Sequence, residues 1–404
     1  MTAARAAATH SDLVVAADSD MHVLEPPDLW QRYIAPEFRH AAPIGMTELR
    51  RDLRVRVKSQ VLLKAGPVRP LKERGGSGIG WRAEQEEAYA AAEARGWDAG
   101  AQLEAMDREG MDLAVLFPSR GLFVLALEST EVSDADGLEP AFATAIARAY
   151  NDWLRDFASA APERLLGCAM VAPHDVAAAA DEVRRTVLEY GFKAVYLPPG
   201  SAVRKPWHHR HFDPLWAVCQ ELGVPVCFHG GGRTGLRPDY SLGEIFGDRL
   251  MLWHCFNQPL GVMACAVSMI GGGVLERFPG LRVGLLEGNC SWAPWLMHRL
   301  DEHCEWVGWY EARDLTRKPS EYWRRQCFAS VDADEETAKQ YVDWFGDENL
   351  VFSTDYPHGD SMYPNAMAGF RKLPLSEASQ RRILGANWSR LYGVELPAKP
   401  LRNG

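Results

Sequence analysis

The chain has 404 residues, of which 47% are apolar and 24% are charged. These proportions are those of a globular protein and exclude a largely disordered chain. The formal charge of −10 at pH 7 argues against a protein whose main surface binds nucleic acid.

The cysteines and the apolar runs indicate a cytoplasmic protein. The eight cysteines form no Cys-x-x-Cys pair, so we expect buried free thiols in a reducing compartment. Residues 1–15 lack the continuous apolar segment of a signal peptide. The uncharged run Pro259–Leu275 contains four glycines and is shorter than the ~20 apolar residues of a membrane span. We therefore expect a buried helix there and no association with a membrane.

Eight short apolar runs alternate with helical patterns along the chain. The predicted strands are Val14–Met21, Asp112–Pro118, Leu165–Val171, Lys193–Pro198, Val224–His229, Leu281–Glu287, Gln326–Val331 and Leu350–Asp355. The helical patterns include Pro140–Ala158, Val176–Tyr190, Pro214–Leu222, Leu260–Phe278, Ala293–Tyr310 and Glu335–Phe345. Runs that are apolar throughout suit strands buried on both faces, and the helices between them imply parallel pairing. Eight such units predict an α/β fold of the (β/α)8 barrel type rather than an open sheet.

A long insertion separates the first two predicted strands. Within it, residues 50–76 hold nine Lys or Arg against two acids. An insertion after a barrel strand begins at the carboxyl face, where active sites lie. We expect residues 1–404 to form one domain, with residues 45–95 as either a lid over that face or a solvated insertion. The basic stretch could also contact nucleic acid or an anionic substrate.

Polar residues end four of the predicted strands. Asp20 and His22 end the first strand and, being two residues apart, point to the same face. His229, Glu287 and Asp355 end the fifth, sixth and eighth strands. Each residue alone has an ordinary structural explanation, but together they form a ring of nitrogen and oxygen ligands. Such a set suits Zn²⁺, or Mn²⁺ and similar ions, and leaves room for a water molecule.

Five segments carry a resemblance to a known family. They are Asp18–Pro26, Gly223–Gly230, Gly273–Val283, Leu350–His358 and Ile383–Gly393, with the sequences DSDMHVLEP, GVPVCFHG, GVLERFPGLRV, LVFSTDYPH and ILGANWSRLYG. In these segments the chain resembles the amidohydrolase-related metalloenzymes, in the branch of aminocarboxymuconate-semialdehyde decarboxylase and the γ-resorcylate-type decarboxylases. The resemblance implies a distorted (β/α)8 barrel, a small-molecule substrate and a homodimer.

The resemblance also implies one divalent metal ion, with Zn²⁺ as the first expectation. Its ligands, carried over by position, are Asp20, His22, His229 and Asp355. Two departures from the family pattern stand out. The first strand ends in Asp-x-His where the family often has two histidines or Glu-x-His, and Glu287 stands where the decarboxylases place a catalytic histidine.

Our main prediction for the reaction is hydrolysis by metal-activated water, with Asp355 as the base and Glu287 as a proton carrier. His254 is a further candidate for contact with the substrate. The alternative is non-oxidative decarboxylation of an aromatic or enol carboxylic acid. A remote alternative is a barrel that binds a ligand without turnover. The enzyme hypothesis is favoured because the ligand set leaves a coordination position open.

Four further residues are candidate substrate contacts. Arg120 and Arg233 follow predicted strands and could clamp a carboxylate bidentately, or form ordinary surface ion pairs. Trp292 and His358 are expected to line the pocket, with Trp295 as another wall of it. The histidines 208, 209 and 211 form a dense cluster that weakly suggests a second metal site.

Overall fold

A computed structural model of the chain describes residues 15–48, 51–63, 83–132, 137–230, 246 and 250–402. Its central sheet has eight strands in the order β1-β5-β6-β7-β8-β9-β10-β11, and every neighbouring pair is parallel. The strands are β1 (Ala17–His22), β5 (Leu113–Phe117), β6 (Leu165–Met170), β7 (Ala194–Leu197), β8 (Val226–His229), β9 (Val283–Leu286), β10 (Cys327–Val331) and β11 (Leu350–Phe352). All eight predicted strands are therefore confirmed, and so is the (β/α)8 barrel.

The first and last strands meet at their carboxyl ends. The amide of His22 donates to the carbonyl of Tyr356 at 2.7 Å, and the amide of Asp355 donates to the carbonyl of Asp20 at 3.2 Å. The indole of Trp388 in the last helix also donates to the carbonyl of Asp18 at 3.0 Å. These contacts bring the carboxyl end of β1 beside the loop that follows β11.

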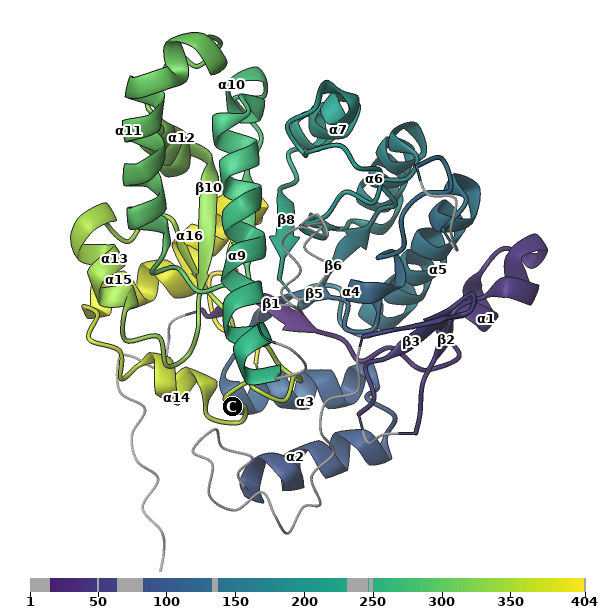
Figure 1. Ribbon diagram of the computed structural model, residues 1–404. Coiled ribbons are helices and arrows are strands. Elements are labelled where there is room, and N and C mark those ends of the chain that lie inside the picture. The colour runs from purple at the N-terminus through teal and green to yellow at the C-terminus, as the bar shows by residue number, and fades with distance from the viewer. Residues whose placement is uncertain are drawn as a thin grey trace, which may run out of the picture.

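Helices surround the sheet (Figure 1). They are α1 (Leu29–Tyr33), α2 (Ala83–Ala94), α3 (Ala99–Glu109), α4 (Gly121–Val124), α5 (Pro140–Ala158), α6 (Val176–Tyr190), α7 (Asp213–Leu222), α9 (Leu250–Gly271), α10 (Val274–Arg277), α11 (Ala293–Glu311), α12 (Pro319–Gln326), α13 (Ala338–Phe345), α14 (Ala366–Phe370), α15 (Glu377–Arg381) and α16 (Asn387–Tyr392). The predicted bounds of α5 and α6 are confirmed. Helix α9 begins ten residues before its predicted start and continues through Pro259. Within the described residues, no helix is long and apolar enough to cross a membrane.

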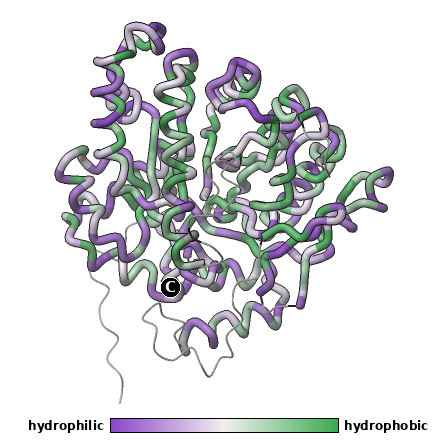
Figure 2. The backbone as a smooth tube through the Cα atoms, in the orientation of Figure 1, coloured by the Kyte–Doolittle hydropathy of each residue, from purple (hydrophilic) through white to green (hydrophobic). Residues whose placement is uncertain are grey.

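The strands form the hydrophobic centre of the molecule. Every residue of β5, β6 and β10 is buried, as expected for strands covered on both faces. Figure 2 shows hydrophobic segments gathered on these central elements. All eight cysteines are free; six are buried, whereas Cys255 is exposed and Cys304 is half-buried. The buried polar residues of β1 are exceptions to this apolar centre, and they mark the site described below.

The described part of the insertion packs on the barrel. It contains a small antiparallel sheet of β2 (Ile44–Gly45), β3 (Val55–Val57) and β4 (Gln60–Leu62), followed by α2. Val55, Val57 and Tyr89 are fully buried and belong to the same hydrophobic core as the strands. The hydroxyl of Tyr89 also donates to the carbonyl of His358 at 3.2 Å, in the loop after β11. The insertion therefore lies at the carboxyl face; its action as a lid stays a prediction.

Candidate active site

Four of the predicted ligands converge at the carboxyl ends of the strands. The Nε2 atoms of His22 and His229 lie 3.0 Å apart. Asp20 Oδ1 lies 3.2 Å from His229 Nε2 and 3.5 Å from His22 Nε2. Asp355 Oδ1 also lies 3.5 Å from His22 Nε2. Because Asp20, His22 and His229 are fully buried, water does not solvate their polar atoms.

The hydrogen bonds of the two imidazoles fix their orientation. His22 Nδ1 lies 2.7 Å from the carbonyl of Pro118, and His229 Nδ1 lies 2.8 Å from the carbonyl of Gly230. A carbonyl only accepts, so we assign the proton of each ring to Nδ1. The lone pairs of both Nε2 atoms then face each other and the carboxylate of Asp20. Neither oxygen of Asp20 has a hydrogen-bond partner among the described residues.

Such a cluster of acceptors requires an added positive charge. In the protein without a metal ion, that charge is a proton on His229. Burial acts to lower the pKa of His229. The negative charges of Asp20 and Glu287 and the hydrogen bonds of the ring act in the opposite direction, and together they raise this pKa to about 10. Burial lowers the pKa of His22 to about 3, so this ring stays neutral. Burial also acts to raise the pKa of Asp20, but the combined charges and hydrogen bonds of His229 and His22 outweigh burial and hold that pKa below its usual range. A divalent cation can take the place of the proton, so the donor set fits a metal ion.

Glu287 follows β9 and lies beside this cluster. Its Oε2 is 3.1 Å from His229 Nδ1, and its Oε1 accepts from Gln258 Nε2 at 2.7 Å. Burial raises the pKa of Glu287 to about 8. Glu287 and Asp355 both have a positive φ, 48° and 54°, which is uncommon for residues other than glycine. Strained backbone of this kind is concentrated at functional sites, where the surrounding structure holds it in place.

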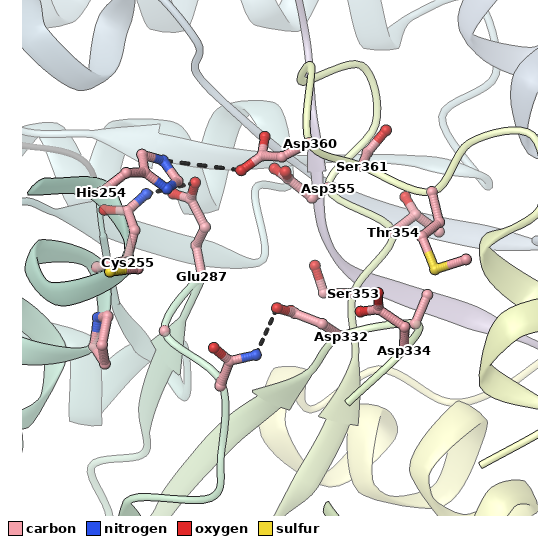
Figure 3. Close-up of a pocket in the computed structure, with 16 residues that line it drawn as sticks. His254, Cys255, Glu287, Asp332, Asp334, Ser353, Thr354, Asp355, Asp360 and Ser361 are labelled. Atoms are coloured by element: carbon pink, nitrogen blue, oxygen red, sulfur yellow. Dashed lines mark hydrogen bonds and ion pairs between the residues drawn. The ribbon is translucent and has the colours of Figure 1, made fainter. Parts of the chain in front are cut away.

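A cavity of about 210 Å³ opens beside Glu287 and Asp355 (Figure 3). Five carboxylates line it: Glu287, Asp332, Asp334, Asp355 and Asp360. Its described wall contains no lysine or arginine. His254 also lines the cavity, with Nε2 3.9 Å from Asp360 Oδ2, and its contact with a substrate stays a prediction.

His358 links Asp355 to the loop that follows β5. His358 Nδ1 lies 2.8 Å from Asp355 Oδ1, and its Nε2 lies 3.0 Å from the hydroxyl of Ser119. The ring also lies over that of His22, with 4.0 Å between their centroids. In this arrangement His358 contacts two of the candidate ligands, and it does not line the cavity.

The loop that carries Ser119 is anchored by a buried carboxylate. Glu25 accepts hydrogen bonds from the backbone amides of Ser119, Arg120 and Gly121, at 3.0, 2.8 and 3.0 Å. Glu25 is fully buried and follows β1. It therefore ties the chain after β1 to the chain after β5, directly beside the candidate ligands.

Other predicted contacts lie elsewhere. The guanidinium of buried Arg120 donates to the carbonyls of Glu25 and Met46, so it does not line the cavity. Trp292 lines a neighbouring cavity, and its indole donates to the carbonyl of Gly288 at 2.8 Å. The expectation that Trp295 walls the pocket is wrong, because it lies on the outer face of α11 with 55% of its surface exposed. Arg233 lies outside the described residues.

Sequence reasoning missed three residues of this region. Asp332 lines the cavity directly after β10, and burial raises its pKa well above the usual range. Its position after a predicted strand was the signal that could have identified it. Ser119 carried the same signal, since it directly follows the predicted strand Asp112–Pro118. Gln258 carried none, because its contact with Glu287 depends on how distant segments come together.

The comparisons with known proteins identify the family of the chain. The family model described as amidohydrolase matches residues 17–394. The 2-amino-3-carboxymuconate-6-semialdehyde decarboxylase of Dictyostelium discoideum is 25% identical over 309 residues, which are 74% of this chain and 77% of the relative. The γ-resorcylate decarboxylase of Rhodococcus jostii is 27% identical over 261 residues, which are 62% of this chain and 77% of the relative.

A solved structure shares the fold. The crystal structure of a dihydroxybenzoic acid decarboxylase from Polaromonas, with bound manganese and an inhibitor, superposes with a TM-score of 0.63 at 19% identity. The match covers 94% of this chain and 97% of that one. Together with the family match, these findings confirm the branch that the sequence motifs indicated. The chain belongs to the amidohydrolase family and is an enzyme, either a hydrolase or a carboxy-lyase.

Proposed function

We propose that the protein is a metal-dependent decarboxylase of a small aromatic or enol carboxylic acid. The observation that carries this proposal is the buried cluster of Asp20, His22 and His229, whose acceptor atoms face one another. The partly buried Asp355 contacts His22 at the edge of this cluster and lines the cavity. The two relatives above, which are decarboxylases by name, support this reaction over the hydrolysis that we first favoured.

These four residues would hold one divalent ion. The bound ion would supply a Lewis acid for a carboxylate or phenolate oxygen of the substrate. Manganese in the Polaromonas structure supports Mn²⁺ as a candidate beside Zn²⁺. The residues of the cavity support the same placement: its described wall contains no lysine or arginine, so an ion held by the cluster would be the positive charge that a substrate carboxylate meets there.

Glu287 is our candidate for the proton donor. Decarboxylation breaks the bond between carbon and carboxylate, releases carbon dioxide and leaves a carbon that must take up one proton. Glu287 lines the cavity and lies next to the cluster, so its carboxyl group reaches a substrate bound there. Gln258 holds the other oxygen of Glu287 and orients the group. Water then returns the proton to Glu287.

Hydrolysis is the second candidate function, and the identity of residue 287 favours it. The resemblance implies a histidine in the decarboxylases at this position, and a carboxylate there repels a departing carboxylate. In this alternative, Asp355 takes a proton from a water molecule that attacks the substrate.

A single assay separates the two candidates. The enzyme is stripped of metal, loaded with Mn²⁺ or Zn²⁺, and supplied with hydroxybenzoates, other carboxylated aromatics, lactones and amides. Release of carbon dioxide with uptake of solvent deuterium at carbon supports decarboxylation. Incorporation of oxygen from labelled water into the product supports hydrolysis. Absence of both reactions over the whole panel, with either metal bound, would contradict the proposal.

A further inference from the structure

A second cavity adjoins the first one, which Glu287 and Asp355 line. The second cavity has a volume of about 540 Å³ and lies between the loop after β9 and the loop after β10. The two cavities have four wall residues in common: Pro259, Gly288, Asn289 and Asp334. Because they share these residues at the carboxyl face of the barrel, a molecule held in the first cavity can extend into the second.

The sizes of the two cavities suggest different occupants. The first cavity measures about 210 Å³, which is less than the roughly 300–1,000 Å³ that is typical of a small-molecule site. The second cavity alone falls within that range. The first cavity therefore has room for the reacting end of a substrate, whereas a substituent of any length needs the second.

Trp292 gives the second cavity a fixed aromatic wall. Its indole nitrogen donates to the carbonyl of Gly288 at 2.8 Å. Its ring packs edge-to-face against that of the fully buried Trp323, with 5.5 Å between the centroids and 82° between the planes. The ring of Trp292 is thus held in place from two directions before any ligand binds. A wall of this kind binds an apolar group at little cost in conformational entropy.

The walls also hold acceptor atoms that no described residue satisfies. Asp334 lines both cavities, and none of the described residues bonds to its exposed carboxylate. Gln258 in the wall of the first cavity is only 7% exposed, yet its Oε1 has no hydrogen-bond partner among the described residues. The described parts of both walls contain no lysine or arginine. Such walls favour a ligand that brings its own hydrogen-bond donors.

We infer that the second cavity is a subsite for a side chain of the substrate, and that this side chain carries an amino or hydroxyl group. The apolar stem of the side chain packs on Trp292, and its terminal group donates to the carboxylate of Asp334. The inference rests on the proposed function for the reacting end of the substrate. It narrows the substrate class to ring-bearing carboxylic acids with a donor-bearing side chain, and it disfavours single-ring acids without one and acids with a second carboxylate.

Calorimetric titration of the full-length, Mn²⁺-loaded enzyme tests this inference. The parent probe is 2-nitrophenol, because a nitro group has the shape of a carboxylate but cannot leave as carbon dioxide. The extended probes carry an ethyl, 2-hydroxyethyl, 2-aminoethyl or 2-carboxyethyl group at ring position 4 or 5. At the better of the two positions, the hydroxyethyl and aminoethyl probes should bind ~10-fold or more tightly than the ethyl probe. The carboxyethyl probe should bind more weakly than the ethyl probe, since it brings a like charge to Asp334.

Two variants locate the subsite. Asp334→Asn keeps an acceptor oxygen but removes the charge, so affinity should fall by ~10-fold for the aminoethyl probe and by less than ~3-fold for the hydroxyethyl probe. Glu336 is exposed and lines only the second cavity. Glu336→Trp fills that cavity and should lower the ratio of the affinity for an extended probe to that for the parent by ~10-fold or more. The control is Glu163→Gln, an exposed acid that lines neither cavity, and it should bind all probes as wild type does.

The outcomes separate this inference from the proposed function. If the parent binds but the hydroxyethyl and aminoethyl probes bind no better than the ethyl probe, the subsite is refuted and the proposed function stands. An unchanged ratio in Glu336→Trp would refute the location of the subsite in the second cavity. If neither the parent nor any extended probe binds the metal-loaded enzyme, the substrate class of the proposed function is wrong and the inference falls with it.

Discussion

The Nε2 atoms of His22 and His229 lie 3.0 Å apart, although the Nδ1 of each ring already faces a backbone carbonyl. Two neutral rings in this orientation direct lone pairs at each other, which is unfavourable in a buried site without a cation. The carboxylate of Asp20 adds negative charge to the same point. The barrel holds these groups together because β1 and β8 end on the same rim. The energy of folding thus keeps these acceptor atoms close together, in a site that a divalent ion would complete.

Glu287→Gln should separate proton transfer from metal binding. Glutamine keeps the size and the contact with Gln258 but cannot donate an acidic proton. We expect near-normal metal content and folding, with turnover reduced by ~10²-fold or more. Steady-state kinetics and elemental analysis of the same preparation give both values. Loss of metal in this variant would indicate that Glu287 is a ligand, and unchanged turnover would leave it a structural role only.

His358→Ala should weaken metal binding through Asp355. His358 orients that carboxylate at 2.8 Å, and loss of such a neighbour typically lowers metal affinity by ~10- to 100-fold. Titration of the stripped protein with Mn²⁺ measures the change. Ser119→Ala removes only the far contact of the ring and should have a smaller effect. Equal affinity in wild type and His358→Ala would refute the positioning role.

Glu25→Ala should destabilise the fold. It leaves three buried backbone amides without their acceptor, and we expect a loss of about 3 kcal/mol in the free energy of unfolding. Denaturant unfolding at fixed metal concentration measures this loss. Glu163→Ala, at an exposed position, is the control and should change the stability by less than about 0.5 kcal/mol. A stable Glu25→Ala variant would mean that the loop after β5 is anchored by other contacts.

The insertion at residues 45–95 should not fold on its own. Val55, Val57 and Tyr89 bury their side chains in the core shared with the barrel, so an isolated fragment would expose them. Limited proteolysis followed by mass spectrometry and circular dichroism of the products tests this expectation. A protease-resistant, folded fragment of this region beside an intact barrel would contradict both the single-domain organisation and the lid proposal.

The sequence predicted the barrel and its rim because both follow from local patterns. Each strand is an apolar run, and Asp20, His22, His229 and Asp355 stand directly at strand ends. Parallel strands bring their carboxyl ends to the same edge of the sheet, so the positions of these residues at strand ends are enough to predict that their side chains lie close together. The contacts of His358 with Ser119 join residues 239 positions apart and depend on closure of the barrel, which no local pattern encodes.

Most of the wrong predictions concerned the direction of side chains that lie beyond the strand ends. The guanidinium of Arg120 donates to backbone carbonyls. Arg120 lies in the loop after β5, where side chains no longer alternate between two faces as they do along a strand, so the strand pattern does not predict its direction. Trp295 was expected in the pocket, yet the helical period of Leu296, Met297 and Leu300 already places it on the outer face. The first error reflects loop geometry, whereas the second could have been avoided from the sequence.

Metal content of the purified enzyme and of His229→Ala tests the central claim most directly. His229 supplies a buried nitrogen to the candidate ligand cluster. After incubation with Mn²⁺ or Zn²⁺ and removal of excess ion, elemental analysis should give about one divalent ion per chain in wild type. It should give almost none in folded His229→Ala, as judged by circular dichroism. Full occupancy in the variant, or none in wild type with either ion, would contradict the account.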